Sequence, residues 1–401
     1  MDRSFLLTLL YFVSIFVYFI DELKFFKFGS VVILLIFVIY QNVFFNNKFR
    51  ILNIFIIVFV SMVIISGLIS EIELGKYQWH ISFFSSLLLA CQTIACFGYT
   101  EYVLMTGQSK RFLSDLTIIL GLCLLISDIY IYSILPSIVE EPIACYFIGN
   151  KFIISYYHIL FFALCGTIFE LSKVIAFLLF IYCLLISKIV YCSTGIIGAL
   201  AFYILYIGRK YFKLILYNPF FFFLAIILSS CFAIFVTFVI ALPMFQSMLE
   251  FLGESPSLTG RTGIYAHIID IIAERPLLGL GNANNTSYVQ YYTGIGNAQN
   301  GLIADIIDWG LIGVTFFLIM VISVISSCKN RERSYCLLCF LYMYIVTGMV
   351  EITMGGKFIV ALSVFLVASH YRHSSIRYLK LLLLFKHYLP NMYQRGRLSN
   401  T

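Results

Sequence analysis

The sequence predicts an all-α membrane protein: a polytopic bundle of about 12 transmembrane helices with one large outer loop that contains a helix. Hydrophobic residues make up 62% of the 401 residues and charged residues 11%, against roughly 25% charged in ordinary soluble domains. Apolar runs long enough to cross a bilayer core of about 30 Å recur from end to end. The whole chain, 1–401, is therefore expected to form a single transmembrane domain.

Each expected span is an apolar run between polar or turn-forming residues. As one helix, residues 174–207 would be about 51 Å long at 1.5 Å per residue, which is too long for a single crossing. We therefore place a break at Ser193-Thr194-Gly195. The expected spans are 4–20, 28–45, 51–70, 80–100, 112–133, 152–169, 174–192, 194–207, 214–242, 301–327, 334–353 and 356–371.

Basic residues orient this chain in the membrane. With both termini inside, 18 of the 26 Lys and Arg residues fall on the cytoplasmic side, as the positive-inside rule expects. Six of them lie in a basic cytoplasmic tail, residues 372–401. The net charge of +7 is thus an orientation signal and indicates no nucleic-acid partner. The eleven cysteines lie mostly within spans and indicate neither a disulfide framework nor a metal site, and no cofactor is expected.

Residues 243–300 interrupt the apolar pattern on the predicted outer face. Gly, Asn, Pro and Thr gather at both ends of this loop, and residues 261–274 between them have helical periodicity. Thr259 is expected to cap this helix, and Pro276 to stop it. One face of the helix is an apolar seam with an arginine at each end: Arg261, Tyr265, Ile268, Ile272 and Arg275. The opposite face carries the polar residues His267, Asp270 and Glu274.

The two arginines of the seam are about 21 Å apart along the helix, so they cannot hold the same small anion. Arg261 lies in the first turn, where free N–H groups and the positive end of the helix dipole favour an anion. A snorkelling interfacial arginine is the alternative for Arg261. Arg275, at the negative end of the dipole, stabilises the helix without any ligand.

Four motifs follow one another in and after this loop: Thr259–Tyr265, Glu274–Gly281, Ala298–Ile303 and Trp309–Gly313. They resemble the shared core of the bacterial O-antigen polymerase and O-antigen ligase family. That family carries Ser-Gly-Arg-x-x-x-Trp, then x-x-Pro-Leu-x-Gly-x-Gly, Ala-His-Asn-x-x-Leu and Leu-Gly-Leu-x-Gly, on about a dozen spans. The order and spacing agree over about 55 residues, and four weak motifs in order are more specific than any one of them.

The resemblance implies glycosyl transfer at the outer, periplasmic face of a bacterial inner membrane. The donor would be a sugar chain on undecaprenyl diphosphate, and the acceptor another lipid-carried sugar. Arg261 would stabilise the departing diphosphate. The ligase histidine of Ala-His-Asn is replaced here by Gln299, which cannot take a proton but could orient a sugar hydroxyl, and this departure favours a polymerase over a ligase.

The acceptor hydroxyl needs a base. Asp305 and Asp308 share a side of the span that begins near residue 301, and carboxylates at membrane depth are functional candidates, although both could stay wet at the interface. His267 is another candidate base, with a structural role as its alternative. The remaining candidates, all for substrate binding, are Asn300, Tyr265, Arg275, Asp308 and Lys151, the last of which could equally be an interfacial anchor.

The favoured function is polymerisation of lipid-linked oligosaccharide repeats, with ligation of polymer to lipid A core as the sibling alternative. A flippase for the same lipid-linked sugar is a third alternative. A flippase should show internal repeats and interrupted helices in both halves, whereas polarity here is concentrated in one loop. Expected partners are the lipid-linked oligosaccharide and membrane lipids, and the sequence does not decide whether a chain-length regulator binds.

Overall fold

The computed structural model describes residues 2–16, 24–43, 49–74, 82–138, 147–240, 244, 247, 261–294 and 296–371. The regular structure in these ranges is entirely helical, without a β-strand. The helices up to the large loop are α1 (Arg3–Phe16), α2 (Lys24–Tyr40), α3 (Arg50–Leu74), α4 (Ser82–Met105), α5 (Ser109–Ile138), α6 (Lys151–Ile168), α7 (Lys173–Ile189), α8 (Ser193–Ile207), α9 (Arg209–Leu216) and α10 (Pro219–Ile240). The later helices are α12 (Arg261–Glu274), α13 (Asn284–Thr293), α14 (Gly301–Ser326), α15 (Tyr335–Thr347) and α16 (Gly356–His370).

Every expected span coincides with a helix, but the helices differ in length. Five helical segments of the described chain are long and apolar enough to cross a membrane: Arg50–Ser70, Ser82–Met105, Ser109–Ser133, Lys151–Ile168 and Gly301–Ser326. A sixth candidate is the bent pair Arg209–Leu216 and Pro219–Cys231, whose axes differ by 92°. Other helices, such as α15 and α16, are apolar but shorter. The chain is therefore a multi-pass, all-helical membrane protein, and the count of twelve crossings stays a prediction.

The chain breaks inside residues 174–207 as expected, but at residues 190–192, because the expected Ser193-Thr194-Gly195 forms the first turn of α8. Helix α7 ends at Ile189 and α8 begins at Ser193. Tyr191, between them, has a left-handed φ of 52°, and the Cys192 sulfur accepts a hydrogen bond from the Gly195 N–H at 3.3 Å, which caps α8. Two helices pack side by side here instead of one long helix.

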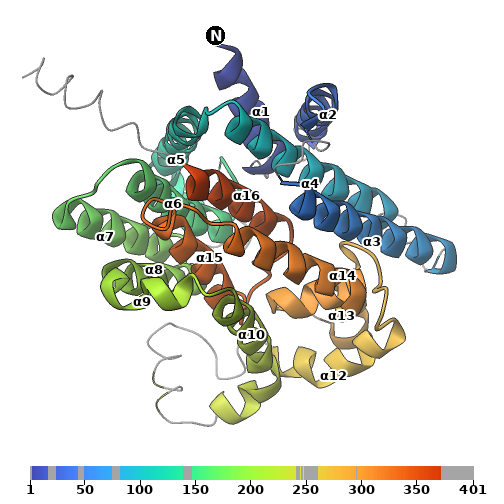
Figure 1. Ribbon diagram of the computed structural model, residues 1–401. Helices are drawn as coiled ribbons and strands as arrows, with labels where there is room; N and C mark the ends of the chain where they lie inside the picture. The colour runs from blue at the N-terminus through green and yellow to red at the C-terminus, as the bar shows by residue number, and fades with distance from the viewer. Residues whose placement is uncertain are drawn as a thin grey trace, which may run out of the picture. The chain divides into compact units, whose positions relative to one another are not determined.

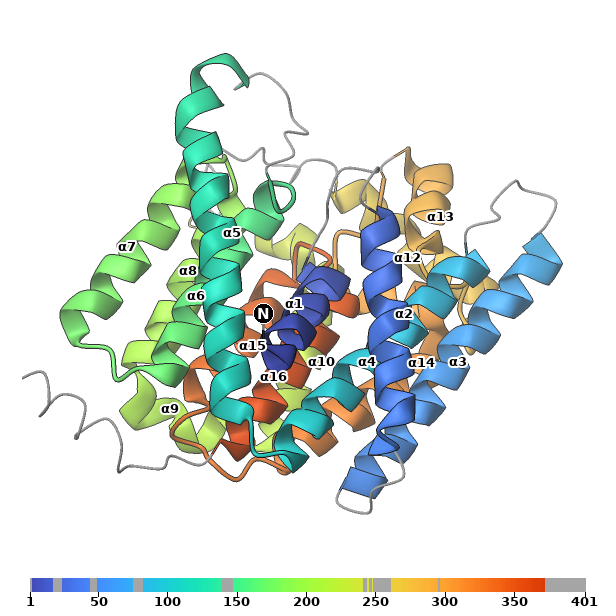
Figure 2. The same ribbon diagram turned by 90° about the horizontal axis from the view of Figure 1, so that it is seen from above.

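Helices α15 and α16 lie in the middle of the described bundle. Nearly all of their side chains are buried. In Figure 2, α5, α7 and α8 lie on one side of this pair and α2, α3 and α4 on the other. Helix α15 packs on α6 and α8, and α16 packs on α4. Because protein surrounds these two short helices, the site that they help to form is shielded from lipid.

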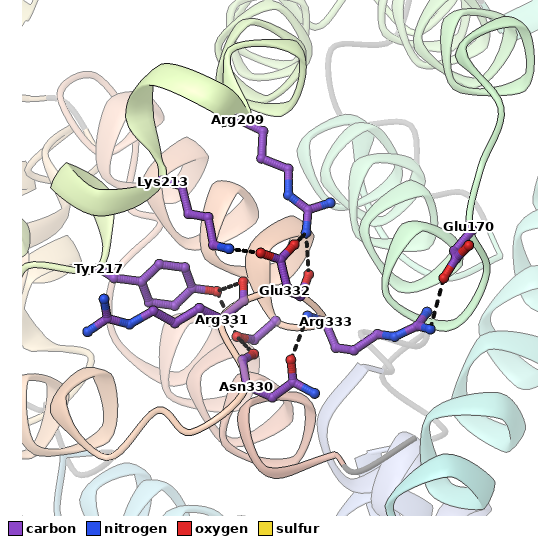
Figure 3. Close-up of polar contacts among 9 residues, drawn as sticks. Glu170, Arg209, Lys213, Tyr217, Asn330, Arg331, Glu332 and Arg333 are labelled. Atoms are coloured by element: carbon purple, nitrogen blue, oxygen red, sulfur yellow. Dashed lines mark hydrogen bonds and ion pairs between the residues drawn. The ribbon is translucent and has the colours of Figure 1, made fainter. Parts of the chain in front are cut away.

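The α14–α15 loop is fixed to α9 by charged and polar side chains (Figure 3). Arg209 and Lys213 of α9 both form ion pairs with Glu332. Tyr217 donates its hydroxyl to the Arg331 carbonyl at 2.9 Å. These groups lie on the side that the charge pattern assigns to the cytoplasm, away from the chemistry considered below.

Helix α14 is interrupted at Gly310, whose φ of 67° and ψ of 177° are not helical. An unbroken helix would bond the N–H groups of residues 311 and 312 to the carbonyls of residues 307 and 308. The segment 276–281 supplies the missing partners, with two N–H donors for the free carbonyls and two carbonyl acceptors for the free N–H groups. The four hydrogen bonds are Leu280 N–H to Ile307 O at 2.7 Å, Gly281 N–H to Asp308 O at 2.9 Å, Leu311 N–H to Pro276 O at 2.8 Å and Ile312 N–H to Leu277 O at 3.1 Å. The break thus leaves these polar groups satisfied, as burial in a membrane protein requires.

Glycine is required on both sides of this junction. A Cβ on Gly310 would lie 2.2 Å from the Leu277 carbonyl oxygen, and one on Gly279 would lie 2.4 Å from the Gly310 nitrogen. The two glycine motifs singled out in the sequence, around residues 274–281 and 309–313, therefore dock onto one another. Their contact fixes the first half of α14, which carries Asp305 and Asp308.

Candidate functional site

A cavity of about 310 Å³ opens among the bundle helices and the first half of α14. Its size is near the lower end of ordinary ligand-binding pockets. Its polar lining includes Asn282 as well as side chains from α2, α4, α14 and α16, and its apolar lining comes largely from α4, α15 and α16. The side chains of most use for chemistry are Lys27, Gln92, Asp305, Asp308 and Lys357, with Trp309, Tyr157 and Tyr344 as aromatic neighbours.

Asp305 lines this cavity although only 3% of its surface is exposed. Its Oδ2 atom is buried and has no hydrogen-bond partner among the described residues. Burying a carboxylate oxygen without a donor is costly, so the position is poorly explained by stability alone. A ligand hydroxyl placed in the cavity would give this oxygen a donor.

Asp308 has a different environment three residues later. Its carboxylate accepts hydrogen bonds from the Ala283 N–H at 3.1 Å, the Asn285 N–H at 2.8 Å and the Asn285 side-chain amide at 2.8 Å. Two of these donors are backbone N–H groups at the start of α13, where a carboxylate is stabilised by the helix dipole. Asp308 therefore anchors α13 to α14, and Asp305 is the carboxylate left for a reaction.

Two lysines reach the same cavity from distant parts of the chain. Lys27 comes from the first turn of α2, and Lys357 from the first turn of α16. Both side chains are half-buried. A cavity with two ammonium groups and one unpartnered carboxylate oxygen can hold an anion and accept a proton in the same space.

The loop helix α12 packs on the opposite face of α14. It begins at Arg261 and ends at Glu274, as the sequence predicts. Its apolar side contributes Ile264, Ile268 and Ile271 to a second small core, which contains Ile303 and Ile307 of α14. The first half of α14 therefore separates this seam from Asp305 and the cavity, and Figure 1 shows α12, α13 and α14 gathered together.

One comparison with known proteins gives a match. The family model described as O-antigen ligase matches residues 174–318. This stretch contains the loop helix, the glycine junction and both aspartates. Residues 174–318 are thus similar to the O-antigen polymerase and ligase family. Members of this family are glycosyltransferase-like enzymes of polysaccharide assembly. Neither the curated proteins nor the solved structures include a match to the chain.

Gln299 and Tyr265, both within the matched stretch, lie together. The Tyr265 hydroxyl donates to the Gln299 carbonyl at 2.9 Å, and Gln299 has a left-handed φ of 50°. Asn300 caps α14, accepting from the Ile303 N–H at 3.2 Å, and its amide group donates to the carbonyls of Ser229 and Met349. The motif Gln299-Asn300 thus fixes the start of α14.

Three other candidates from the sequence, His267, Arg275 and Lys151, are not among the residues that line the cavity. His267 is exposed on the outer side of α12, with Asp270 3.9 Å away. Arg275 donates to the Ser70 hydroxyl at 3.4 Å. Lys151 lies over the Phe152 ring at 5.3 Å, a geometry typical of an anchored helix end. Arg261 is the first residue of α12, and its side chain lies outside the described part of the structure.

Helix α13 was not expected from the sequence, because its residues read as a polar loop. It is held by Asp308 at its start and by Tyr292, which donates its hydroxyl to the Glu274 carboxylate of α12. This hydrogen bond to a carboxylate raises the pKa of Tyr292 to about 12. The described part of the loop, residues 261–294 and 296–300, therefore contains a packed pair of helices mounted on α14.

Lys27 and Lys357 were also missed, because lysines at helix ends read as interfacial anchors. A signal was present in the sequence. Both belong to the eight basic residues that the predicted topology leaves outside the cytoplasmic set, and Lys357 follows the pair Gly355-Gly356 at the start of a span.

Proposed function

We propose that this protein is a polymerase for O-antigen or a related surface polysaccharide. It joins oligosaccharide repeats carried on undecaprenyl diphosphate at the periplasmic face of the bacterial inner membrane. The observation that carries the proposal is Asp305, a buried carboxylate in a lysine-containing cavity, with one oxygen that has no hydrogen-bond partner in the described part of the chain. Asp305 lies within the stretch that matches the family. Arg261, the candidate from the sequence, lies on a helix that packs against the other face of α14.

Asp305 acts as the general base in the proposed reaction. It takes the proton of the acceptor hydroxyl while the hydroxyl oxygen forms a bond to the anomeric carbon of the donor sugar. The bond from that carbon to the diphosphate oxygen breaks, and its electron pair leaves with the lipid diphosphate. Positive groups near the leaving oxygen stabilise its growing charge, and burial of the base favours proton transfer from a hydroxyl held beside it.

The predicted topology is consistent with chemistry on the outer side. Lys27 and Lys357 lie in the first turns of α2 and α16, Asp305 in the second turn of α14, and Tyr344 near the end of α15. The charge pattern assigns each of these helix ends to the outer face. A lipid-linked sugar delivered to the outer face would therefore lie at the same level of the membrane as the cavity.

The residue at position 299 favours polymerase over ligase. Ligases of the family use the histidine of Ala-His-Asn, and this chain has Gln299, whose backbone carbonyl is held by Tyr265. Ligation to a lipid A core is the second candidate, because the matching family model is described as O-antigen ligase. A flippase has no comparable support.

The surface polysaccharide of a deletion strain separates these functions. Loss of a polymerase should leave single repeats on the lipid A core, whereas loss of a ligase should leave unattached polymer. Complementation with Asp305→Asn should fail to restore polymer, and Asp270→Asn, at an exposed carboxylate of α12, should restore it. Unattached polymer in the deletion strain would assign the protein to ligation instead.

A further inference from the structure

The start of α16 brings backbone and side-chain donors to the cavity. Gly355, Gly356 and Lys357 all line it. The Gly355 carbonyl accepts the Ile359 N–H at 3.0 Å and so opens the helix. The first N–H groups of any α-helix lack a carbonyl acceptor within the helix, and the helix dipole places positive potential at this end. Helix starts of this kind bind phosphate groups.

Gly355 allows the backbone to come this close to Asp305. Its φ of 80° is left-handed, and a Cβ there would lie 3.2 Å from the Asp305 Oδ1 atom. With glycine at both 355 and 356, neither of these residues places a side chain of its own between the first turn of α16 and the cavity. The unpartnered Asp305 oxygen, on a side chain that is only 3% exposed, marks the same space as a ligand site independently of the helix start.

Lys27 adds a second ammonium group to the same cavity from α2. The two lysines and the N-terminus of α16 together carry enough positive charge to bind more than one phosphate group. Asp308, the other acid of the lining, is already bound to donors of α13, so its charge is largely compensated. An anion with two phosphates suits this arrangement better than a neutral sugar does.

We infer that Lys27, Lys357 and the Gly355-Gly356 turn form a cradle that binds the diphosphate of the lipid carrier. This inference rests on the proposed function and specifies how its donor is held. The diphosphate would lie at the start of α16, and Asp305, which lines the same cavity, would face the acceptor hydroxyl. Both lysines and the turn lie outside residues 174–318, the stretch that matches the family.

Binding of undecaprenyl diphosphate to the purified full-length protein in detergent tests the cradle. Lys27→Gln and Lys357→Gln should each weaken binding about tenfold, and together about 100-fold, because each change removes one charge-assisted hydrogen bond to the diphosphate. Lys210→Gln, at an exposed lysine of α9, is the matched control and should bind normally. Undecaprenyl monophosphate should bind more weakly and depend less on the two lysines.

Two results would overturn the cradle. One is binding within twofold of the parent protein in the double variant. The other is loss of binding in Arg261→Gln while both lysine variants bind normally, which would move the diphosphate to α12. The melting temperature of each variant shows whether it folds. If the double variant does not fold, the single variants that do fold test the cradle, together with Lys357→Arg, which should keep the affinity of the parent protein. Because binding needs neither acceptor nor turnover, a failure of the polymerase proposal would leave this result interpretable.

Discussion

Asp305 and Asp308 lie on one half-helix, yet their surroundings assign them different roles. Asp308 accepts three hydrogen bonds from the first residues of α13 and the residue before them. Asp305 has a buried oxygen with no partner among the described residues. A helical spacing of three predicts that both carboxylates share a side, but only tertiary structure decides which one is already engaged.

Asparagine at each position separates chemistry from stability. Asp305→Asn removes the base while keeping the side-chain volume, so we expect an unchanged melting temperature and polymerisation slowed about 10²–10⁴-fold. Asp308→Asn places an amide against donors of α13, so we expect a lower melting temperature, with a cost of about 1–3 kcal/mol. Thermal denaturation and initial rates at matched protein concentration give both values. The reverse pattern would exchange the two roles.

The helices themselves were largely predictable. Apolar runs gave the expected positions of the spans within a few residues, because lipid-facing and core-facing positions are both apolar and the signal is strong. The loop helix at 261–274 followed from its periodicity and Pro276. Helices α9 and α13 were not predicted, because their polar residues give no such signal. Neither was the break at Gly310, since a lone glycine in an apolar run also occurs in unbroken helices.

The glycine junction gives a prediction at the scale of the element. Gly310 occupies a backbone region open almost only to glycine, so alanine there should cost about 1–3 kcal/mol, in addition to the clash with the Leu277 carbonyl. Gly310→Ala and Gly279→Ala should therefore lower the melting temperature and the yield of folded protein. Gly263→Ala is the control, because a Cβ there meets nothing within 4 Å and alanine favours a helix by about 1 kcal/mol. Equal stability of all three variants would refute the junction.

At the scale of the whole molecule, the cavity joins segments far apart in the chain. Lys27, Asp305 and Lys357 come from α2, α14 and α16. The local pattern around each lysine indicates an ordinary helix end, and their convergence depends on the packing of α16 against α4 and of α4 against α2. The sequence therefore predicted Asp305 as a site residue from its position in a span next to a family motif. The positions of Lys27 and Lys357 in the site were not predictable from the local pattern.

The same topology predicts which surfaces face outward. Tyr291 of α13 is 77% exposed and should lie in the periplasm, whereas the exposed Lys210 of α9 should lie in the cytoplasm. In a cysteine-free background, Tyr291→Cys should react with a membrane-impermeant thiol reagent on intact spheroplasts, and Lys210→Cys only after lysis. Labelling of Lys210→Cys on intact spheroplasts, with Tyr291→Cys protected, would invert the orientation and place the cavity on the wrong side for the proposed donor.

Polymer formation by the purified protein tests the central claim most directly. The protein, reconstituted in lipid vesicles, is given the undecaprenyl-diphosphate-linked repeat as its only substrate, and products are separated by chain length. The account predicts a ladder of polymer that releases undecaprenyl diphosphate, with lipid A core not required, and a greatly reduced ladder from Asp305→Asn. Product that forms only when lipid A core is supplied, or a normal ladder from Asp305→Asn, would contradict it.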